Sequence, residues 1–313
     1  MHLVVAIPCY NEAASVAQVV LGIPRAIDGV TTTEVVVIDD GSTDGSSVIA
    51  RQLGASVVRH EKNMGLGVAF QSAMQYCINQ RADMMVLIDA DNQFDGDEIP
   101  LLISPVVGGR ADMVIGSRFL DPSVTPNMPR AKVIGNKMMA WWISKLVRQK
   151  YFDVSCGFRC YSREALLRMT IQSTFTYTQE VFLDLVSKNL LIKEVPVHVR
   201  YFADRESRIA KSLFRYAVNT ALIVLRGFRD YFPLRFFSYI SLSCLMSALF
   251  FAAVLIAHFL STGMFRGYLF AGVLAAFFVT LAIVFMIIGI IADMLSRMRS
   301  IQEEVLYLAR KAS

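Results

Sequence analysis

The stretch Val86–Ile99, which reads VLIDADNQFDGDEI, passes abruptly from apolar to acidic residues. Asp89 and Asp91 follow the apolar run directly and are two residues apart. Carboxylates this close repel one another unless a cation or a basic partner lies among them, and oxygen ligands suit Mg²⁺ or Mn²⁺. An acidic turn between a strand and a helix is the alternative, because carboxylates stabilise a helix N-terminus. We interpret the later acidic residues in that second way: Asp95, Asp97 and Glu98.

Short β-branched runs alternate with helical stretches over the first 120 residues. The predicted strands are Leu3–Ile7, Glu34–Ile38, Ser56–Arg59, Met84–Ile88, Met113–Gly116 and, later in the chain, Ile192–Phe202. The predicted helices are Glu12–Leu21, Ser46–Leu53, Gly67–Asn79, Lys132–Val147 and Gln179–Lys188. This alternation predicts an α/β fold with a mainly parallel sheet. Ligands bind such sheets beyond the carboxyl ends of the strands, which is where the polar motifs PCYNE, DDGSTD and DADNQ fall.

Two long uncharged runs dominate the C-terminal third of the chain. Residues 236–265 and 267–292 contain no Asp, Glu, Lys or Arg, and each run exceeds the ~20 residues that a helix needs to cross a bilayer. A buried helical hairpin in a soluble core is the alternative. We predict transmembrane helices at 236–260 and 268–292. The flanking segments are a basic amphipathic juxtamembrane region at 205–235, for which an ordinary pair of surface helices is the alternative, and a tail at 293–313 whose apolar stripe could pack on a neighbouring copy.

Basic residues flank these two predicted spans unevenly. Arg226, Arg229 and Arg235 precede the first span, whereas the connecting loop carries only Arg266. The positive-inside rule then places the catalytic domain and both termini on the cytoplasmic side of the cell membrane. The start of the chain shows no basic region or cleavage site of a signal peptide, and five cysteines without a zinc-site spacing suit that reducing side as free thiols.

Seven motifs occur together in a recognisable order: IPCYNE, VIDDGSTDGS, NMGLG, LIDADNQ, GSRF, DVSCGFRCYSRE and RESR. In this order they resemble the family 2 glycosyltransferases of GT-A fold. More closely, the chain is similar to the polyprenyl-phosphate hexose synthases, the dolichyl-phosphate mannose or glucose synthase group. The resemblance covers roughly residues 3–215 and implies a Rossmann-like GT-A catalytic domain, which we place at 1–204. The first two motifs are typical of the whole superfamily, whereas DADNQ, GFR and the basic RESR segment favour the lipid-phosphate subgroup.

The resemblance implies roles for individual residues on the donor side. Asp89, Asp91 and Gln93 would serve Mg²⁺ or Mn²⁺ and the diphosphate, whose departure a divalent cation stabilises. The two aspartates would point to one side of an extended strand end, and Gln93 would continue that side. Besides these aspartates, the nucleotide-sugar residues would be Pro8, Tyr10, Glu12, Asp39, Asp40 and Ala90. We interpret Asp44 as a helix cap, and leave open whether Gly65 and Gly67 approach the nucleotide or form a turn.

The acceptor implied by the resemblance is a lipid monophosphate, which is largely an anion at neutral pH. It needs cationic positioning more than a general base, and guanidinium groups match phosphate geometry. The expected acceptor residues are Arg118, Arg130, Arg159, Arg205, Ser207 and Arg208, and Arg118 joins Asp89 and Asp91 as a catalytic residue. Relatives commonly read Gly-x-Ser-Lys where this chain has Arg-Glu-Ser-Arg at 205–208. Glu180 matches an acidic position of the family and could contact sugar hydroxyls or an arginine.

These roles imply an inverting, metal-dependent hexosyltransferase. It would move a hexose from a nucleotide diphosphate sugar, of the UDP-glucose or GDP-mannose type, to a polyprenyl or dolichyl phosphate at the cytoplasmic leaflet. A processive membrane polysaccharide synthase is one alternative, although the chain has no Gln-x-x-Arg-Trp motif. A catalytically silent membrane adapter with the same fold is the other. The expected partners are the nucleotide sugar, the polyprenyl phosphate, the membrane and further copies of the chain in a homo-oligomer; we expect no nucleic acid.

Overall fold

The computed structural model describes residues 1–121, 128, 130–171, 177–200, 222 and 225–312, with only the backbone described at 130–132. The chain divides into two compact units. Unit 1 comprises Met1–Val224 and Glu304–Ser313, and unit 2 comprises Leu225–Glu303. The catalytic region predicted at 1–204 therefore lies within a unit that also includes the C-terminal end of the chain.

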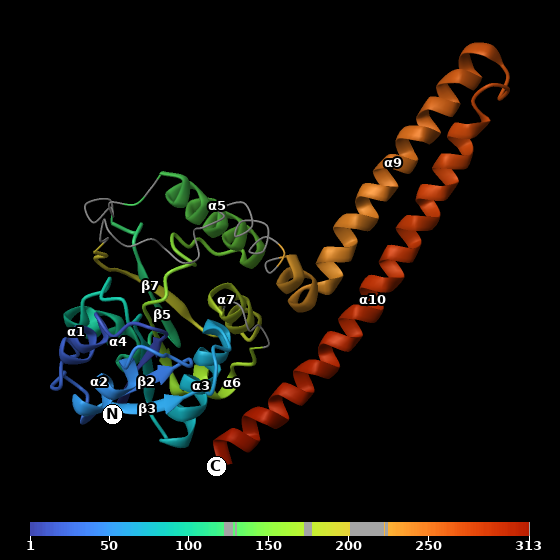
Figure 1. Ribbon diagram of the computed structural model, residues 1–313. Helices are drawn as coiled ribbons and strands as arrows, with labels where there is room; N and C mark the ends of the chain where they lie inside the picture. The colour runs from blue at the N-terminus through green and yellow to red at the C-terminus, as the bar shows by residue number, and fades with distance from the viewer. Residues whose placement is uncertain (122–127, 129, 172–176, 201–221, 223–224, 313) are drawn as a thin grey trace. The chain divides into compact units, whose positions relative to one another are not determined.

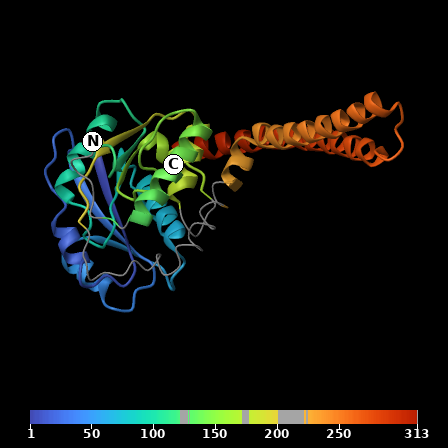
Figure 2. The same cartoon turned by 90° about the horizontal axis from the view of Figure 1, so that it is seen from above.

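Unit 1 is built on a seven-stranded sheet (Figure 1 and Figure 2). Its strands are β1 (His2–Cys9), β2 (Thr32–Asp39), β3 (Ser56–Arg59), β4 (Met84–Leu87), β5 (Met113–Ser117), β6 (Arg159–Ser162) and β7 (Ile192–Pro196). The order across the sheet is β3-β2-β1-β4-β6-β5-β7. β6 runs antiparallel to both of its neighbours, whereas the other neighbouring strands are parallel. The mainly parallel sheet predicted from the sequence is confirmed.

Helices follow most of the strands and cover the sheet. They are α1 (Val16–Leu21), α2 (Ser46–Gln52), α3 (Leu66–Asn79), α4 (Ile99–Val107), α5 (Arg130–Val147), α6 (Arg163–Arg168) and α7 (Thr178–Ser187), and a 3-10 turn, η1 (Gly96–Glu98), precedes α4. α3 packs on β1, β2 and β4 and also on α6, while α4 packs on β4 to β7. Because crossover helices cover parallel strands on both faces, every residue of β4 and β5 is buried.

Besides β7, which ends at Pro196 although the sequence predicted a strand over 192–202, two features of unit 1 differ from the sequence-based expectation. α1 begins at Val16 rather than at Glu12, because Asn11 has a positive φ of 53° and the chain first makes a turn in which the carbonyl of Glu12 accepts the amide of Ser15. The second feature is β6, which the sequence did not predict. Its four residues, Arg-Cys-Tyr-Ser, include no β-branched side chain, and the strand exists because it fills the gap between β4 and β5.

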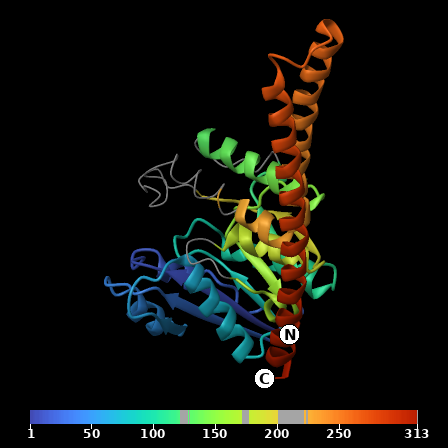
Figure 3. The same ribbon diagram turned by 90° about the vertical axis from the view of Figure 1, so that its right-hand side faces the viewer.

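Unit 2 is a pair of long helices, α9 (Pro233–Thr262) and α10 (Leu269–Ala312), both long and apolar enough to cross a membrane. They run side by side (Figure 3). The hydroxyl of Ser241 donates to the carbonyl of Ala282 at 2.8 Å, which joins the two helices. A Cβ at Gly289 would lie 2.9 Å from the Cβ of Phe237, so this glycine permits a close approach. The predicted span at 236–260 lies within α9, and the one at 268–292 begins one residue before α10.

The predicted tail at 293–313 is not a separate element, because α10 continues unbroken through it. The last turns of α10 belong to unit 1 and pack on α6. Tyr307 is buried there, and its hydroxyl donates to Glu164 at 3.1 Å. Arg310 donates to the carbonyl of Met169 at 2.7 Å, at the C-terminal end of α6. A basic side chain at this position satisfies carbonyls that have no partner within the helix.

Candidate active site

One edge of the sheet gathers the carboxyl ends of the six parallel strands and the beginning of β6. The register pairs Cys9 with Asp39 at the ends of β1 and β2. Because β6 is antiparallel, its first residue, Arg159, pairs with Leu87, the last residue of β4. The polar segments after β1, β2, β4 and β5 therefore meet the loop that leads into β6. This is the edge at which the sequence predicted a ligand site.

Asp89 and Asp91 lie in a turn directly after β4. The strand ends at Leu87, and Asn92 has a positive φ of 59°, so the pair does not lie on an extended strand end as expected. The turn is closed by Asp91, whose Oδ1 accepts the backbone amide of Gln93 at 3.1 Å. The two carboxylates are nevertheless close enough for the charge of Asp91 to raise the pKa of Asp89. A turn, rather than strand pleating, brings the acidic pair together.

The carboxylate of Asp89 is strongly perturbed by its surroundings. Burial, and then the charge of Asp91, raise the pKa of Asp89 to about 7, while Arg118 and Arg159 act in the opposite direction. Gly157, in the loop before β6, packs directly on the Asp89 carboxylate. A Cβ at this position would lie 3.0 Å from Oδ2 and 3.3 Å from Oδ1. Asp89 is thus confined beside a second carboxylate, and a cation would relieve the repulsion.

Arg118 follows β5 and forms a buried ion pair with Asp153. Its Nε donates to Oδ2 of Asp153 at 2.6 Å and its Nη2 donates to Oδ1 at 2.9 Å, a bidentate geometry that orients the guanidinium. The backbone amide of Asp153 in turn donates to Oε1 of Glu194 at 2.7 Å, so β7 braces the loop that holds Arg118. Sequence reasoning missed both carboxylates as site residues. Asp153 could have been found, because it begins the motif DVSCGFRCYSRE. Glu194 belongs to no motif, and only the pairing of β7 with β5 brings it to this site.

Arg159 is fully buried, and this corrects its predicted role at the acceptor phosphate. Each of its guanidinium nitrogens donates to a backbone carbonyl. The acceptors are Cys156 for Nε at 2.7 Å, Thr178 for Nη1 at 2.9 Å and Val154 for Nη2 at 2.9 Å. A group with these bonds and no exposed surface cannot contact a lipid phosphate. Arg159 instead joins the loop before β6 to the start of α7, and its charge reaches Asp89.

Asp39 and Asp40 close the loops that follow β2 and β3, and their contact with the nucleotide stays a prediction. Asp39 has no exposed surface, and its Oδ1 accepts the amide of Ser42 at 2.8 Å. Asp40 is also buried, and its two oxygens accept the amides of Met64 at 2.9 Å and Gly65 at 2.8 Å. The positive φ of Gly65, 94°, shows that this glycine serves the turn. Both carboxylates shape the edge from within the protein.

The remaining predicted nucleotide residues differ in how far their side chains are exposed to solvent. Pro8 is buried within the strand, and Ala90 is buried in the turn that holds the acidic pair. Tyr10 is 37% exposed at the strand end. Glu12 is half-buried and accepts a hydrogen bond from the hydroxyl of Ser15 at 3.0 Å. Tyr10 and Glu12 are therefore the side chains of this set with surface available to a ligand.

Asp44 binds the first amide of α2 from the position before the N-cap residue, which is Gly45, so it supports the start of the helix without being its N-cap residue. Its Oδ1 accepts the amide of Ser46, the first residue of α2, at 3.1 Å, and its Oδ2 accepts the amide of Ala13 at 2.9 Å. Burial alone would raise the pKa of Asp44, but hydrogen bonds from Ser46 and Ala13 outweigh it and lower the pKa. Asp44 thus ties α2 to the PCYNE segment.

The other predicted acceptor residues fall largely outside what the structure describes. Arg205, Ser207 and Arg208 lie outside the described residues. The backbone of Arg130 begins α5, and its side chain is likewise not among the described parts. Glu180 lies half-buried in the first turn of α7. Of the predicted arginines, Arg118 is the one whose described position keeps it in the site.

The acidic pair fits a divalent cation that shares its ligands with a substrate. Among the described residues, no group of three or more His, Cys, Asp or Glu side chains is placed to hold a metal. Asp89 and Asp91 would supply two carboxylates, with the half-buried Gln93 in the same turn, and diphosphate oxygens suit the remaining positions of a hard cation. Burial and then the neighbouring charge of Asp91 raise the pKa of Asp89, so this turn is suited to positive charge.

Comparisons with known proteins agree with this geometry. The description of glycosyl transferase family 2 matches residues 4–170, more than half of the chain. The chain is 25% identical over 240 residues to a UDP-N-acetylglucosamine–dolichyl-phosphate N-acetylglucosaminyltransferase of Methanococcus voltae, covering 70% of this chain and 94% of that protein. It is 30% identical over 198 residues to a dolichyl-phosphate hexose transferase of Haloferax volcanii, covering 63% of this chain and 82% of that protein.

Solved structures show the same fold. Glucosyl-3-phosphoglycerate synthase from Mycobacterium tuberculosis, solved with Mg²⁺ and uridine diphosphate, superposes with a TM-score of 0.58 at 20% identity, covering 72% of this chain and 79% of that chain. The seven-stranded, mainly parallel sheet is thus a GT-A fold, followed here by two long apolar helices. By its matching sequence region and its fold, this chain belongs to glycosyl transferase family 2.

Proposed function

We propose that this protein is an inverting glycosyltransferase that moves a hexose from a nucleotide diphosphate sugar to the phosphate of a polyprenyl lipid. The observation that carries the proposal is the meeting of the Asp89–Asp91 pair with the Arg118–Asp153 ion pair around one carboxyl edge. The acidic pair suits a cation and diphosphate, and the arginine suits phosphate. The relatives named for dolichyl phosphate support the acceptor class, and two apolar helices supply a membrane attachment.

The reaction needs few groups from the protein. An oxygen of the acceptor phosphate forms a bond to the anomeric carbon while the bond from that carbon to the donor diphosphate breaks. The nucleoside diphosphate leaves with the bonding electrons, and the anomeric configuration inverts. A divalent cation held by Asp89 and Asp91 would neutralise charge on the departing diphosphate. Arg118, held in place by Asp153, offers a positive charge that does not have to reorganise during the reaction.

We assign the nucleoside of the donor to the segment after β1. Tyr10 offers an exposed ring for a base or ribose, and Glu12 offers a half-buried carboxylate that could accept from hydroxyl groups. Gln93, in the turn with the acidic pair, would contact the diphosphate side. Replacing Tyr10 with Ala should weaken nucleotide binding, measured by calorimetry, without lowering the melting temperature. The exposed ring makes a large loss of stability unexpected.

The acceptor phosphate is assigned to Arg118, Arg130 and the basic segment at 205–208. Arg130→Ala is the sharpest test, because Arg118→Ala would also leave the buried Asp153 without its partner. Loss of one charged contact should weaken acceptor use by about tenfold to a hundredfold. The affinity for the nucleotide sugar should stay the same in calorimetry. An Arg130→Ala protein that melts like the wild type and uses the lipid equally well would remove Arg130 from the site.

We further propose that the catalytic domain and both termini are cytoplasmic and that the chain self-associates. The motivation is the arginine excess outside the two apolar helices and the exposed apolar side chains along α10, among them Leu295, Met298 and Ile301. Single cysteines at Gly263 and Ser313, in a cysteine-free background, test the orientation in intact cells. An impermeant reagent that labels position 313 but not 263 would show the opposite orientation. Crosslinking through position 298 tests self-association.

The reaction itself is tested with the full-length protein and a polyprenyl phosphate, incubated with a panel of UDP- and GDP-sugars. Release of a nucleoside diphosphate together with a glycosylated lipid phosphate is the expected result. Asp91→Asn should lower turnover by at least about tenfold, equivalent to some 1.4 kcal/mol of barrier. Activity in excess chelator equal to that in Mg²⁺ or Mn²⁺ would contradict the metal assignment. Donor binding without turnover for every sugar would favour the silent adapter.

A further inference from the structure

Helix α5 has one face packed on the domain and an opposite face that is open and apolar. The packed face carries Asn136, Ala140 and Ile143, which are 8%, 2% and 0% exposed. Residues that follow the same helical spacing half a turn away are more than half exposed: Ile134, Met138, Trp141 and Trp142. Such a division is typical of an amphipathic helix, but here the outer face is not polar. We call these four residues the tryptophan face.

Tryptophan is concentrated on this face in an unusual way. The chain contains only two tryptophans, and they are the adjacent residues Trp141 and Trp142. They are 55% and 53% exposed, and their rings meet edge to face with centroids 5.5 Å apart. Indole combines a large apolar ring with a single N–H donor, so it is enriched where one end of a residue meets hydrocarbon and the other meets water. The exposed pair therefore indicates an interface partner of that mixed character.

Positive charge surrounds the tryptophan face. Residues 130–150 contain six Lys or Arg residues and no Asp or Glu. Within the described part of the chain, Lys145 and Arg148 form no ion pair, and the ammonium of Lys145 stands 6.0 Å from the centre of the Trp141 ring. Unpaired basic groups beside exposed aromatic rings favour an anionic partner.

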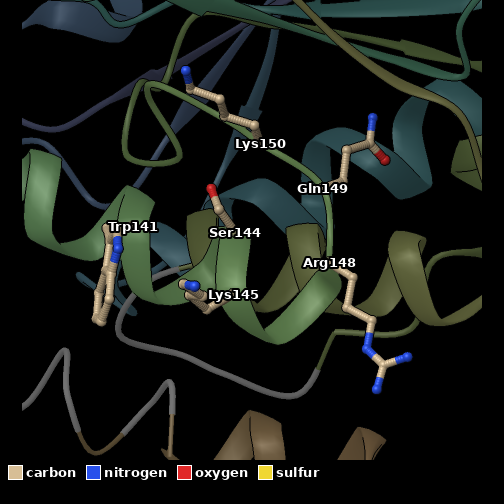
Figure 4. A pocket seen from close by; sticks show the side chains of 6 residues that line it. All are labelled: Trp141, Ser144, Lys145, Arg148, Gln149 and Lys150. Atoms are coloured by element: carbon tan, nitrogen blue, oxygen red, sulfur yellow. The ribbon is translucent and has the colours of Figure 1, made fainter.

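A hollow at the C-terminal end of α5 gathers these basic groups. It has a volume of about 430 Å³ and is lined by Trp141, Ser144, Lys145, Arg148, Gln149 and Lys150. Figure 4 shows the first three residues on the helix and the last three on the segment that leaves it. The Ser144 hydroxyl is used within the protein, because it donates to the carbonyl of Ala140 and accepts the amide of Tyr151. Arg148 and Lys150 point away from each other (Figure 4), so these basic groups extend the charged rim of the tryptophan face and do not converge on a single point.

We propose that the tryptophan face docks on the surface of an anionic bilayer, with the indole rings at the level of the headgroups and the basic groups of the adjoining hollow facing the anionic surface. Two observations favour a bilayer over a second copy of the chain. Two copies related by a twofold axis would place this all-basic segment against itself. The chain also carries two helices long and apolar enough to cross a membrane, so a bilayer is always within reach of the domain. The proposal is independent of the sugar-transfer reaction.

The two tryptophans make the test direct, because tryptophan emission of the full-length protein, excited selectively over its tyrosines, reports on this face alone. The protein is reconstituted in vesicles of phosphatidylcholine, with or without phosphatidylglycerol. Lipids that carry a nitroxide on the headgroup are compared with iodide in the water as quenchers. We expect the lipid nitroxide to quench the emission, and iodide to quench it less than it quenches free indole. Both effects should be stronger in the vesicles that contain phosphatidylglycerol.

Charge reversal provides the second arm of the experiment. Lys145→Glu combined with Arg148→Glu should weaken docking by at least about tenfold, since each basic group near an anionic surface contributes roughly fivefold. Arg51→Glu, an exposed arginine of α2, is the matched control and should leave the quenching unchanged. Equal melting temperatures would show that all variants are folded.

Two results would overturn the proposal. If iodide quenches the emission as strongly as it quenches free indole, and the lipid nitroxide has no effect, then the tryptophan face lies in water. If the emission is shielded from both quenchers and the shielding disappears when the protein is diluted within the vesicles, then a second copy covers the face. Lipid quenching that is identical for the wild type and the charge-reversed variant would remove the basic hollow from the proposal.

Discussion

Replacing Asp89 with Asn should abolish most of the activity and at the same time stabilise the metal-free protein. The carboxylate is confined against Gly157 and lies beside Asp91, and burial and that neighbour raise its pKa from 3.8 to about 7. An asparagine keeps the shape of the side chain but carries no charge. The variant should therefore lose the cation site, with at least about a tenfold fall in turnover, and should also lose the repulsion.

The size of the stabilisation follows from the pKa of Asp89. A rise from 3.8 to about 7 corresponds to roughly 4 kcal/mol of unfavourable free energy for the ionised carboxylate. We expect about half of this, roughly 2 kcal/mol, because the turn can relax and because Asp89 is only partly buried. For a unit of this size, that is a rise of about 4–8 °C in melting temperature.

The pH dependence of this difference has a defined sign. Between pH 3.8 and about 7 the folded protein holds a proton on Asp89 that the unfolded chain has released. The stability contributed by this group therefore falls as the pH rises, and it is lowest above the folded pKa. The asparagine variant has no such fall. In chelator, the excess stability of the variant should be full at pH 8 and should shrink as the pH falls toward 5.

Thermal melts of the two proteins in chelator and in Mg²⁺ or Mn²⁺ supply the assay. The metal should raise the melting temperature of the wild type and leave that of the variant unchanged, because only the wild type binds it. Asp97→Asn, at an exposed carboxylate of the same segment, is the control and should leave the effect of the metal on the melting temperature unchanged. A variant that melts below the wild type at pH 8 in chelator would refute the account of Asp89 as a destabilised, cation-ready carboxylate.

Three further substitutions test other contacts of the structure. Gly157→Ala should lower kcat with little change in melting temperature, because its Cβ would press on the Asp89 carboxylate at 3.0 Å; full activity would contradict that contact. Arg159→Met should destabilise the catalytic unit by roughly 2–4 kcal/mol, since buried carbonyls lose their donors; an unchanged denaturant midpoint would argue against it. Arg310→Met should speed amide exchange in the last turns of α10, whereas Arg297→Met, at a mostly exposed arginine of the same helix, should not; equal exchange in both would rule out the docking on α6.

The sequence by itself determined the regular elements of the first half of the chain. The strand predicted at Ser56–Arg59 has the same bounds in the structure. The strand predicted at Met84–Ile88 ends one residue earlier in the structure, at Leu87. These elements can be predicted from the sequence because their local secondary-structure propensity agrees with the pattern of buried apolar residues. The acidic pair, the motif order of the family and the two uncharged runs are also local features. Each could therefore be recognised without knowledge of what packs against it.

Only the tertiary structure decided which polar side chains face a ligand and which are used within the protein. Arg159 and Arg118 look alike in the sequence, yet one donates only to backbone carbonyls in the core and the other is held by Asp153. Asp39 likewise has no exposed surface, although it stands at a strand end. The physical reason is that a charged group's role depends on its hydrogen-bond partners, and these come from segments far apart in the chain. β6 is the extreme case, because its four residues become a strand only between two strands already in place.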